Sequence, residues 1–410
     1  MNQMTPNNIP QGYKATALGI IPQEWEVKKL GEVGKLLSGL TYTPSNIQSD
    51  GILVLRSSNI QNGVLAFDDN VYVNISSYTP VKAGDILICV RNGSQNLIGK
   101  TALITQEAEG CAFGAFMAVF RSPISKYVFY LLGTELYRKY IFRNLGATIN
   151  SINGSDLKKF RFPFPPLAEQ QKIAEVLGVW DEAIEKQARL IEKLALRKRG
   201  LMQRLLSAKL RLPGFSEPWQ KVNYSDILKE VRRTLTWDEN ELYDLISVRR
   251  RSGGVFHRES LYGHEIKTKT LRPALEGDFL ISKMQIVHGA SGVVPKQLSG
   301  MKISGSYIAL IAKDPKELNI NYFNLWSQMP LFYHQTFVSS YGVHIEKMTF
   351  DLDAFMSLSM NLPPIEEQDR IVEIILTATN EIELAKEKLD RLRRQKRGLM
   401  QQLLTGKKRI

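Results

Sequence analysis

Cysteine is almost absent from this sequence, which contains only Cys89 and Cys111 in 410 residues. Both lie in apolar runs, far from each other, and neither has the spacing of metal-binding cysteines. We therefore expect two buried, reduced thiols in an intracellular protein.

Long apolar segments are also missing. No stretch approaches the about 18 residues that a membrane-spanning helix needs, and residues 1–14 lack the apolar centre of a signal peptide. These absences predict a soluble, cytoplasmic protein with no membrane partner.

Motifs that carry catalysis are scarce. Residues 93–101 resemble a phosphate-binding loop, but five residues rather than four separate Gly93 from Gly99, and the following residues favour a strand instead of a helix. No Asn/Asp-Pro-Pro-aromatic box occurs, and the five histidines show no ligand spacing. The sequence therefore predicts no catalytic residue, no metal site and no cofactor in this chain.

The balance of charge indicates a polyanionic partner. The formal net charge is +13, although charged residues make up an ordinary 23% of the chain. Nucleic acid is the first candidate for that partner and an anionic membrane surface the second.

Most of the sequence occurs twice. Residues 165–209 and 363–407 align without a gap, from Pro-Pro-Leu-Ala-Glu-Gln and Pro-Pro-Ile-Glu-Glu-Gln to a shared Lys-Arg-Gly-Leu-Met-Gln. Two copies of about 200 residues indicate a duplication rather than a solenoid. We predict an α+β protein with globular domains at 1–164 and 210–362 and long helices at 165–209 and 363–410.

Each repeat has the apolar spacing of a coiled-coil helix. The predicted seam consists of Ile173, Leu177, Trp180, Ile184, Leu194, Ile371, Ile375, Ile382, Leu389 and Leu392. Each helix is acidic at its start and basic at its end, which favours an antiparallel pair with pseudo-two-fold symmetry. In that arrangement, the C-terminus should lie near the segment from Tyr13 to Trp25.

The two globular segments share a scaffold but not their loops. Gly84-Asp-Ile-Leu-Ile and Gly277-Asp-Phe-Leu-Ile each predict a turn followed by a buried strand, after which the two copies diverge. The loops offer arginine, which pairs with guanine, and asparagine or glutamine, which pair with adenine. The candidate DNA contacts are Arg56, Ser57, Asn59, Gln61, Arg91, Asn92, Ser94, Gln95, Lys100, Arg249, Arg250, Arg251, Lys283, Gln285 and His288.

In combination, these motifs resemble the specificity subunits of Type I restriction–modification systems over nearly the whole chain. The repeated helices are similar to that family's spacer regions. The Gly84-Asp-Ile-Leu-Ile and Gly277-Asp-Phe-Leu-Ile segments, with His288-Gly-Ala-Ser-Gly-Val-Val-Pro295, are similar to its target recognition domains. The resemblance implies a chain without catalysis that reads a bipartite, asymmetric site in double-stranded DNA. It also implies two methyltransferase subunits and two restriction subunits as partners, which carry S-adenosylmethionine, ATP and Mg²⁺.

Two alternatives stay open at this point. One is a DNA-binding regulator that acts alone, and the other is a P-loop or nuclease enzyme with a helical tail.

Overall fold

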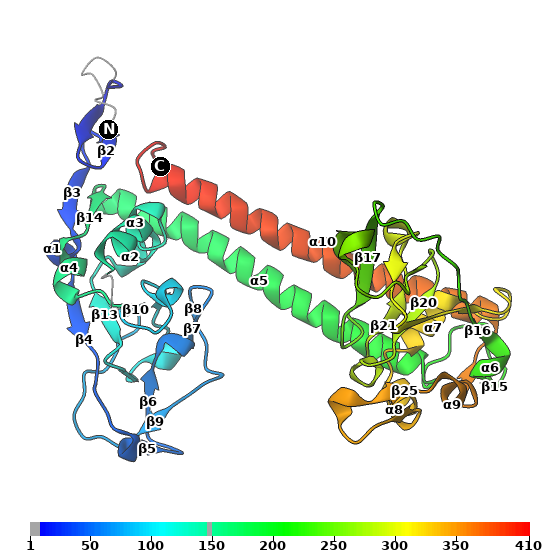
Figure 1. Ribbon diagram of the computed structural model, residues 1–410. Coiled ribbons are helices and arrows are strands. Elements are labelled where there is room, and N and C mark those ends of the chain that lie inside the picture. Colours follow the sequence, from blue (N-terminus) through cyan, green and yellow to red (C-terminus); the bar gives the residue numbers. More distant parts are fainter. Residues whose placement is uncertain (1–8, 146–149) are drawn as a thin grey trace. The chain divides into compact units, whose positions relative to one another are not determined.

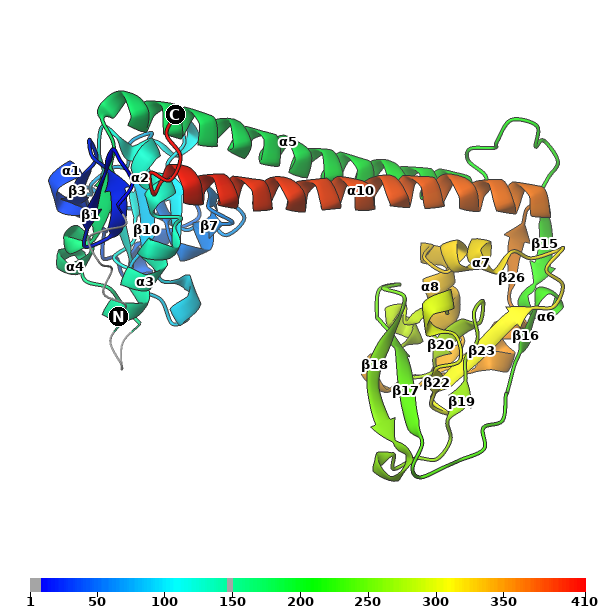
Figure 2. The same cartoon turned by 90° about the horizontal axis from the view of Figure 1, so that it is seen from above.

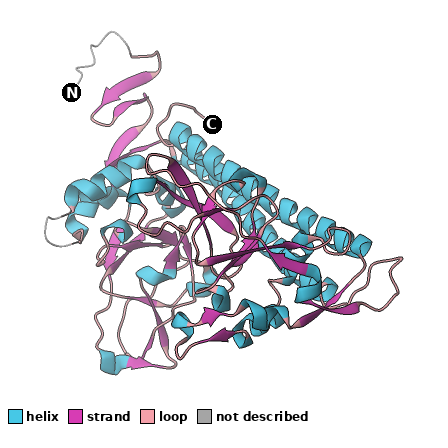
Figure 3. Cartoon of the chain, turned by 45° about the vertical axis from the view of Figure 1, so that its right-hand side comes forward, coloured by secondary structure: helices cyan, strands magenta, loops and turns pink. Residues whose placement is uncertain are grey.

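The computed structural model describes residues 9–145 and 150–410, which form two compact units. The first unit combines Met1–Ala188 with Glu387–Ile410, and the second is Arg189–Lys386. Short helices alternate with strands in both (Figure 3). Each unit takes in one globular segment and parts of both long helices.

Two four-stranded sheets form the centre of the first unit. One has the antiparallel order β11 (Thr101–Leu103), β10 (Ile86–Cys89), β13 (Met117–Arg121), β4 (Lys35–Ser38). The other has the order β12 (Ala112–Phe113), β6 (Ile52–Leu55), β9 (Tyr72–Val73), β5 (Ile47–Gln48), with β12 and β6 parallel.

Two-stranded pairs and short helices surround these sheets. The pairs are β1 (Tyr13–Thr16) with β2 (Gly19–Pro22), β3 (Glu26–Lys29) with β14 (Arg161–Phe164), and β7 (Ile60–Gln61) with β8 (Val64–Leu65). The short helices are α1 (Leu30–Val33), α2 (Ser125–Leu131), α3 (Glu135–Asn144) and α4 (Gly154–Lys159).

The second unit repeats this plan with its own strands. Its sheets have the orders β16 (Leu228–Glu230), β23 (Tyr307–Ala312), β20 (Phe279–Ser282), β21 (Ser291–Val293) and β18 (Val255–Tyr262), β17 (Leu242–Val248), β22 (Lys302–Ile303), β19 (Arg272–Pro273). β15 (Gln220–Asn223) pairs with β26 (Ser359–Leu362), and β24 (Ser340–Tyr341) with β25 (Thr349–Phe350). The short helices are α6 (Tyr224–Ile227), α7 (Ile320–Trp326), α8 (Pro330–Val338) and α9 (Leu352–Met356).

The two Gly-Asp turns precede fully buried strands, as the sequence predicts. All residues of β10 and β20 are buried, and Asp85 and Asp278 are buried beside them. Asp85 accepts hydrogen bonds from Arg121 in β13, whereas Asp278 accepts them from Arg233, after β16. The carboxylate therefore has a structural role in both units, and its arginine comes from a strand in the first unit and from the segment after a strand in the second.

Helix α5 spans Leu167–Leu205 and helix α10 spans Ile365–Leu403, so both begin directly after a Pro-Pro pair. At 1.5 Å per residue, each is about 58 Å long. The start of α5 shares a core in the first unit with Leu403 and Leu404 at the end of α10 (Figure 1). The start of α10, which follows β26 (Figure 2), shares a core in the second unit with Leu205 and Leu206 at the end of α5. The two helices are therefore antiparallel.

A buried carboxylate fixes the first of these contacts. Glu169 accepts hydrogen bonds from Trp25 Nε1 at 3.1 Å, from Arg409 Nε at 2.7 Å and from Arg409 Nη2 at 2.9 Å. Nearby, the Tyr13 hydroxyl donates to the Gly406 carbonyl at 3.1 Å, and Arg409 also contacts Glu24. The predicted position of the C-terminus beside residues 13–25 is thus confirmed.

The second unit contains the same arrangement. Glu367, 1% exposed, accepts hydrogen bonds from Trp219 Nε1 at 3.0 Å and from Arg211 Nε and Nη2 at 2.9 and 3.0 Å. Arg211 and Arg409 occupy the same position in the two repeats. We call each of these glutamate–tryptophan–arginine sets a carboxylate clamp.

The burial of the seam residues varies along the two helices. Ile173, Leu177, Ile371, Ile375, Ile382 and Leu389 are buried, and Trp180, Ile184, Leu194 and Leu392 are half-buried. Lys396, which interrupts the second seam, contacts Asp181 and lies 5.0 Å from the centre of the Tyr130 ring. Tyr130 also donates to Asp181 at 2.8 Å, and its burial, followed by the nearby Asp181 charge, raises the pKa of this tyrosine.

Among the described residues, no helix has both the length and the apolar composition of a membrane span. Within the same ranges, no cluster of three or more histidine, cysteine or acidic side chains could hold a metal ion.

Candidate nucleic-acid interface

Two loops meet at one edge of the first unit because the strands before them are parallel. β6 ends at Leu55 and β12 at Phe113, and these two residues are partners in the register. Parallel strands bring the segments that follow them to the same edge of a sheet. Arg56 and the segment from Gly114 to Phe116 therefore lie side by side, with the Gly114 amide bonded to the Leu55 carbonyl at 3.0 Å.

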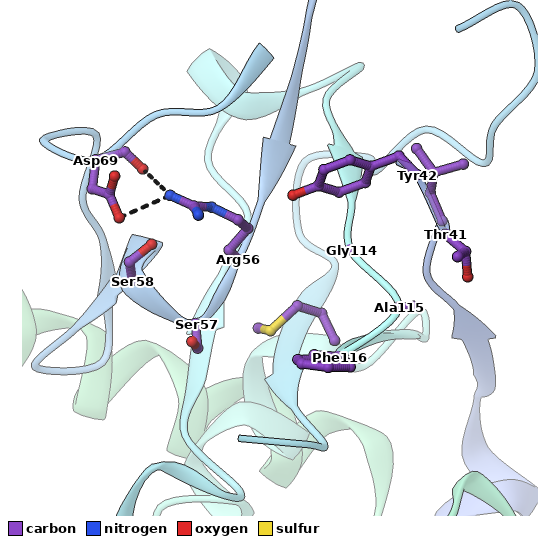
Figure 4. Close-up of a pocket in the computed structure, with 11 residues that line it drawn as sticks. Thr41, Tyr42, Arg56, Ser57, Ser58, Asp69, Gly114, Ala115 and Phe116 are labelled. Carbon is purple, nitrogen blue, oxygen red and sulfur yellow. Dashed lines mark hydrogen bonds and ion pairs between the residues drawn. The ribbon is translucent and has the colours of Figure 1, made fainter. Parts of the chain in front are cut away.

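A hollow of about 490 Å³ opens between these loops (Figure 4). Its wall includes Tyr42, Arg56, Ser58, Asp69 and Phe116, a residue that is 55% exposed. The wall thus combines two aromatic rings with charged and hydroxyl groups. Such a surface can stack on a base and bond to its polar edge.

Arg56 is oriented by Asp69. Its Nη2 lies 2.8 Å from the Asp69 carboxylate and donates to the Asp69 carbonyl at 3.1 Å (Figure 4). The Arg56 Nε–H and the Ser58 hydroxyl are buried and have no hydrogen-bond partner among the residues that the structure describes. Buried polar groups are normally paired, so both are available to a ligand or to water at this site.

The structure brings together the two loop clusters predicted in the first unit. The Asn92 side-chain amide donates to the Ser57 hydroxyl at 2.9 Å, which links the segment after β6 to the segment after β10. The Arg91 guanidinium lies 5.6 Å from the centre of the Phe116 ring. Ser94 and Gln95 are exposed on the same loop. One continuous surface therefore carries arginine, amide and hydroxyl groups.

One predicted contact in this unit has a different role. Asn59 is fully buried; its oxygen accepts the Arg56 amide at 2.9 Å and its nitrogen donates to the Ala66 carbonyl at 2.9 Å. Its side chain therefore holds the turn that presents Arg56 and does not face outward. Gln61 is exposed in β7, and Lys100 is half-buried just before β11.

In the second unit, the turn after β17 meets the segment after β20. Arg251 has a left-handed backbone (φ 57°), and its amide donates to the His288 carbonyl at 2.7 Å. Arg250 donates to the Gln285 side chain and, at 2.8 Å, to Glu346. His288 Nε2 lies 3.2 Å from the other Glu346 oxygen. Two residues predicted from separate segments, Arg250 and His288, thus contact one carboxylate, and Gln285 joins them through Arg250.

Two further predicted residues lie beside this group. Arg249 stacks 4.0 Å from the centre of the Phe256 ring, within the same β17–β18 hairpin. Lys283 borders two hollows of about 450 and 300 Å³, whose walls also contain Arg232 and Glu230. The cations Lys283 and Arg232 can contact a phosphate backbone there.

Sequence reasoning missed Tyr42, Asp69, Phe116 and Glu346. Phe116 follows a glycine turn after an apolar strand, a pattern that can mark an exposed aromatic residue. The other three come from segments that only tertiary folding brings to the site. The sequence from Gly93 to Thr101, which resembles a phosphate-binding loop, is followed by strand β11 rather than by the helix that such a loop requires.

Relatives of this chain are recognisable over most of its length. The profile of the Type I restriction modification DNA specificity domain matches residues 22–195 and again residues 216–394. A Methanocaldococcus jannaschii protein named as the MjaX specificity subunit of a type I restriction enzyme is 26% identical, over 98% of this chain and 97% of its own. The EcoKI specificity subunit of Escherichia coli K12 is 28% identical over about half of each chain, 54% of this one and 52% of the other.

Solved structures show the same fold. A chain from a study of complex assembly in the type I R-M system superposes with a TM-score of 0.58 at 18% identity, covering 94% of this chain and 99% of the other. The S subunit of a type I restriction–modification system from M. genitalium gives a TM-score of 0.55 at 15% identity, covering 93% and 96%. With two matches to the family profile that together span most of its residues, this chain belongs to the Type I restriction modification DNA specificity domain family.

Proposed function

We propose that this chain reads a bipartite, asymmetric sequence in double-stranded DNA, with one half-site read by each unit. The observation that carries the proposal is that a shared scaffold presents two different sets of side chains. In the first unit the set is built around Arg56, Arg91 and Asn92, and in the second around Arg250 and Gln285. Different donors and acceptors read different bases, so the half-sites differ and the whole site is asymmetric.

The charge of the chain supports contact with the duplex. Its net charge of +13 attracts the phosphate backbone, which supplies affinity without sequence information. Arg249 and Arg251, which are exposed on either side of Arg250, are suited to this role in the second unit.

We further propose that the chain directs other subunits to the site and performs no chemistry itself. Two methyltransferase subunits carrying S-adenosylmethionine and two restriction subunits using ATP and Mg²⁺ complete the complex. The family relationship supports this division of labour. In this scheme, α5 and α10 set the length of the unread gap between the half-sites.

Single-molecule sequencing of methylated adenines, in cells that express the intact system, tests the proposal. We expect one motif with two short, different half-sites separated by a gap of fixed length. A contiguous motif, a palindrome or unmethylated DNA would contradict it, and the last result would favour a DNA-binding protein that acts alone.

A further inference from the structure

The β24–β25 hairpin of the second unit is anchored at its base. Ser340 pairs with Phe350 and Tyr341 with Thr349, and the Phe350 amide donates to the Lys283 carbonyl at 3.0 Å. Gly342 has φ 149°, and a Cβ there would lie 3.0 Å from the Met348 Cα. A glycine is thus required for the chain to turn back on itself at this point.

The tip of this hairpin exposes apolar side chains. Val343 is 95% exposed, Tyr341 64% and Ile345 51%. An isolated apolar residue on a surface is ordinary, but three within five residues on a projecting turn form an apolar tip.

This tip lies at the edge of the candidate base-reading group. Glu346, three residues after Val343, contacts Arg250 at 2.8 Å and His288 at 3.2 Å. These two contacts tie the hairpin to the groups proposed to read bases. Val343 is therefore three residues along the chain from a residue that contacts both Arg250 and His288.

The charges around the tip favour DNA over a protein as its partner. Lys347, Arg250 and Arg251 are exposed nearby, and the carboxylate of Glu346 is engaged by Arg250. The apolar side chains thus stand among cations, whereas interfaces between proteins are depleted of charge at their centre. The apolar feature of a DNA major groove is the 5-methyl group of thymine.

We propose that the hairpin tip is a specificity element in which Val343 packs against the 5-methyl group of a thymine in the half-site read by the second unit. The proposal rests on the proposed function and extends it, since it adds an apolar contact to the polar base contacts. It makes Glu346 a positioning residue that holds Arg250 and the hairpin together.

Replacing thymine by deoxyuridine removes only the methyl group and therefore tests this contact. The full chain, in its complex with the methyltransferase subunits, is titrated with cognate duplexes in which each thymine of that half-site is replaced in turn. We expect one position at which the replacement weakens binding about three- to fivefold, the effect of exposing roughly one buried methyl group.

Val343→Ala should weaken binding to the thymine duplex and abolish the difference at that position, and Val343→Ile should retain it. Leu242→Ala, at the opposite end of β17 from Arg249 and also exposed, is the matched control and should change neither value.

The outcomes separate the two proposals. If wild-type protein does not distinguish cognate from random duplex, the proposed function fails. If it does distinguish them, the proposed function stands. The hairpin inference is then overturned if no thymine position shows a loss of binding that Val343→Ala abolishes, or if the half-site contains no A·T pair. The inference is also overturned if Val343→Asp releases the methyltransferase subunits and leaves DNA binding intact, because the tip would then contact protein.

Discussion

Glu169 and Arg409, which are 240 residues apart in the chain, form a two-pronged ion pair with Nε–Oε1 and Nη2–Oε2 distances of 2.7 and 2.9 Å. Arg211 and Glu367 form the equivalent pair in the second unit. The arginine that follows each long helix thus binds the glutamate that begins the other. This exchange requires the helices to run antiparallel, and it places the C-terminal segment at Arg409 in the first unit, where Glu169 also binds Trp25.

Removing one arginine of a carboxylate clamp should destabilise the unit that contains it. In Arg211→Met, the nearly fully buried Glu367 carboxylate loses both bonds from Arg211 and, among the described residues, keeps the bond from Trp219. Because hydrogen bonds to charged groups contribute roughly 1.5–3 kcal/mol, we expect the free energy of unfolding to fall by about 2 kcal/mol or more. Urea denaturation monitored by tryptophan fluorescence measures it, with the exposed Arg394→Met as control. An unfolding midpoint equal to that of the control would contradict the structural role of the clamp.

The antiparallel helices were predictable because their signals are local. A Pro-Pro pair stands directly before each 39-residue helix, and the seven-residue apolar period and the opposite end charges stand within it. The carboxylate clamps were not predictable as contacts, since Glu169 meets Trp25 and Arg409 only after folding. Burial also could not be inferred for Asn59, because nothing in Arg56-Ser-Ser-Asn-Ile-Gln distinguishes an amide that faces inward from one that faces outward.

Asn59 and Gln95 should therefore respond differently to alanine. Asn59→Ala removes the acceptor of the Arg56 amide and should lower the free energy of unfolding by about 1–3 kcal/mol. Gln95→Ala leaves folding unchanged and, on our hypothesis, costs about 1–3 kcal/mol of discrimination at one base pair of one half-site. Thermal unfolding and competition binding with single-base variants of the site measure the two effects. Equal losses of binding to target and random DNA in Gln95→Ala would refute a base contact at that residue.

Arg251 should contribute to affinity rather than to sequence choice. It is exposed at the turn after β17. If it neutralises a phosphate, Arg251→Ala weakens binding to all duplexes alike and reduces the slope of log K against log salt by about one unit. Binding titrations at several salt concentrations measure that slope. A change confined to the cognate duplex would instead assign Arg251 to a base.

Cys89 should resist thiol reagents in the folded protein. It is buried and free, and burial raises the pKa of its thiol to about 11. Since only the thiolate reacts, the reactive fraction at pH 8 is lower than for an ordinary cysteine and grows as the pH approaches 11. Mass spectrometry after iodoacetamide labelling, with and without urea, follows the modification. Rapid labelling of Cys89 at pH 8 without urea would show that the β10 core is more open than the structure indicates.

The central claim is that each unit reads its own half-site, and a comparison of two methylomes tests it most directly. One strain carries Arg91→Ala with Asn92→Ala in the first unit, and the other carries Arg250→Ala with Gln285→Ala in the second. We expect each pair of substitutions to relax or abolish the base preference at one half-site, and the affected half-site to differ between the two strains. The other half-site and the gap length should keep their wild-type values. Degeneracy in both half-sites from either pair, or in the same half-site from both pairs, would contradict the account.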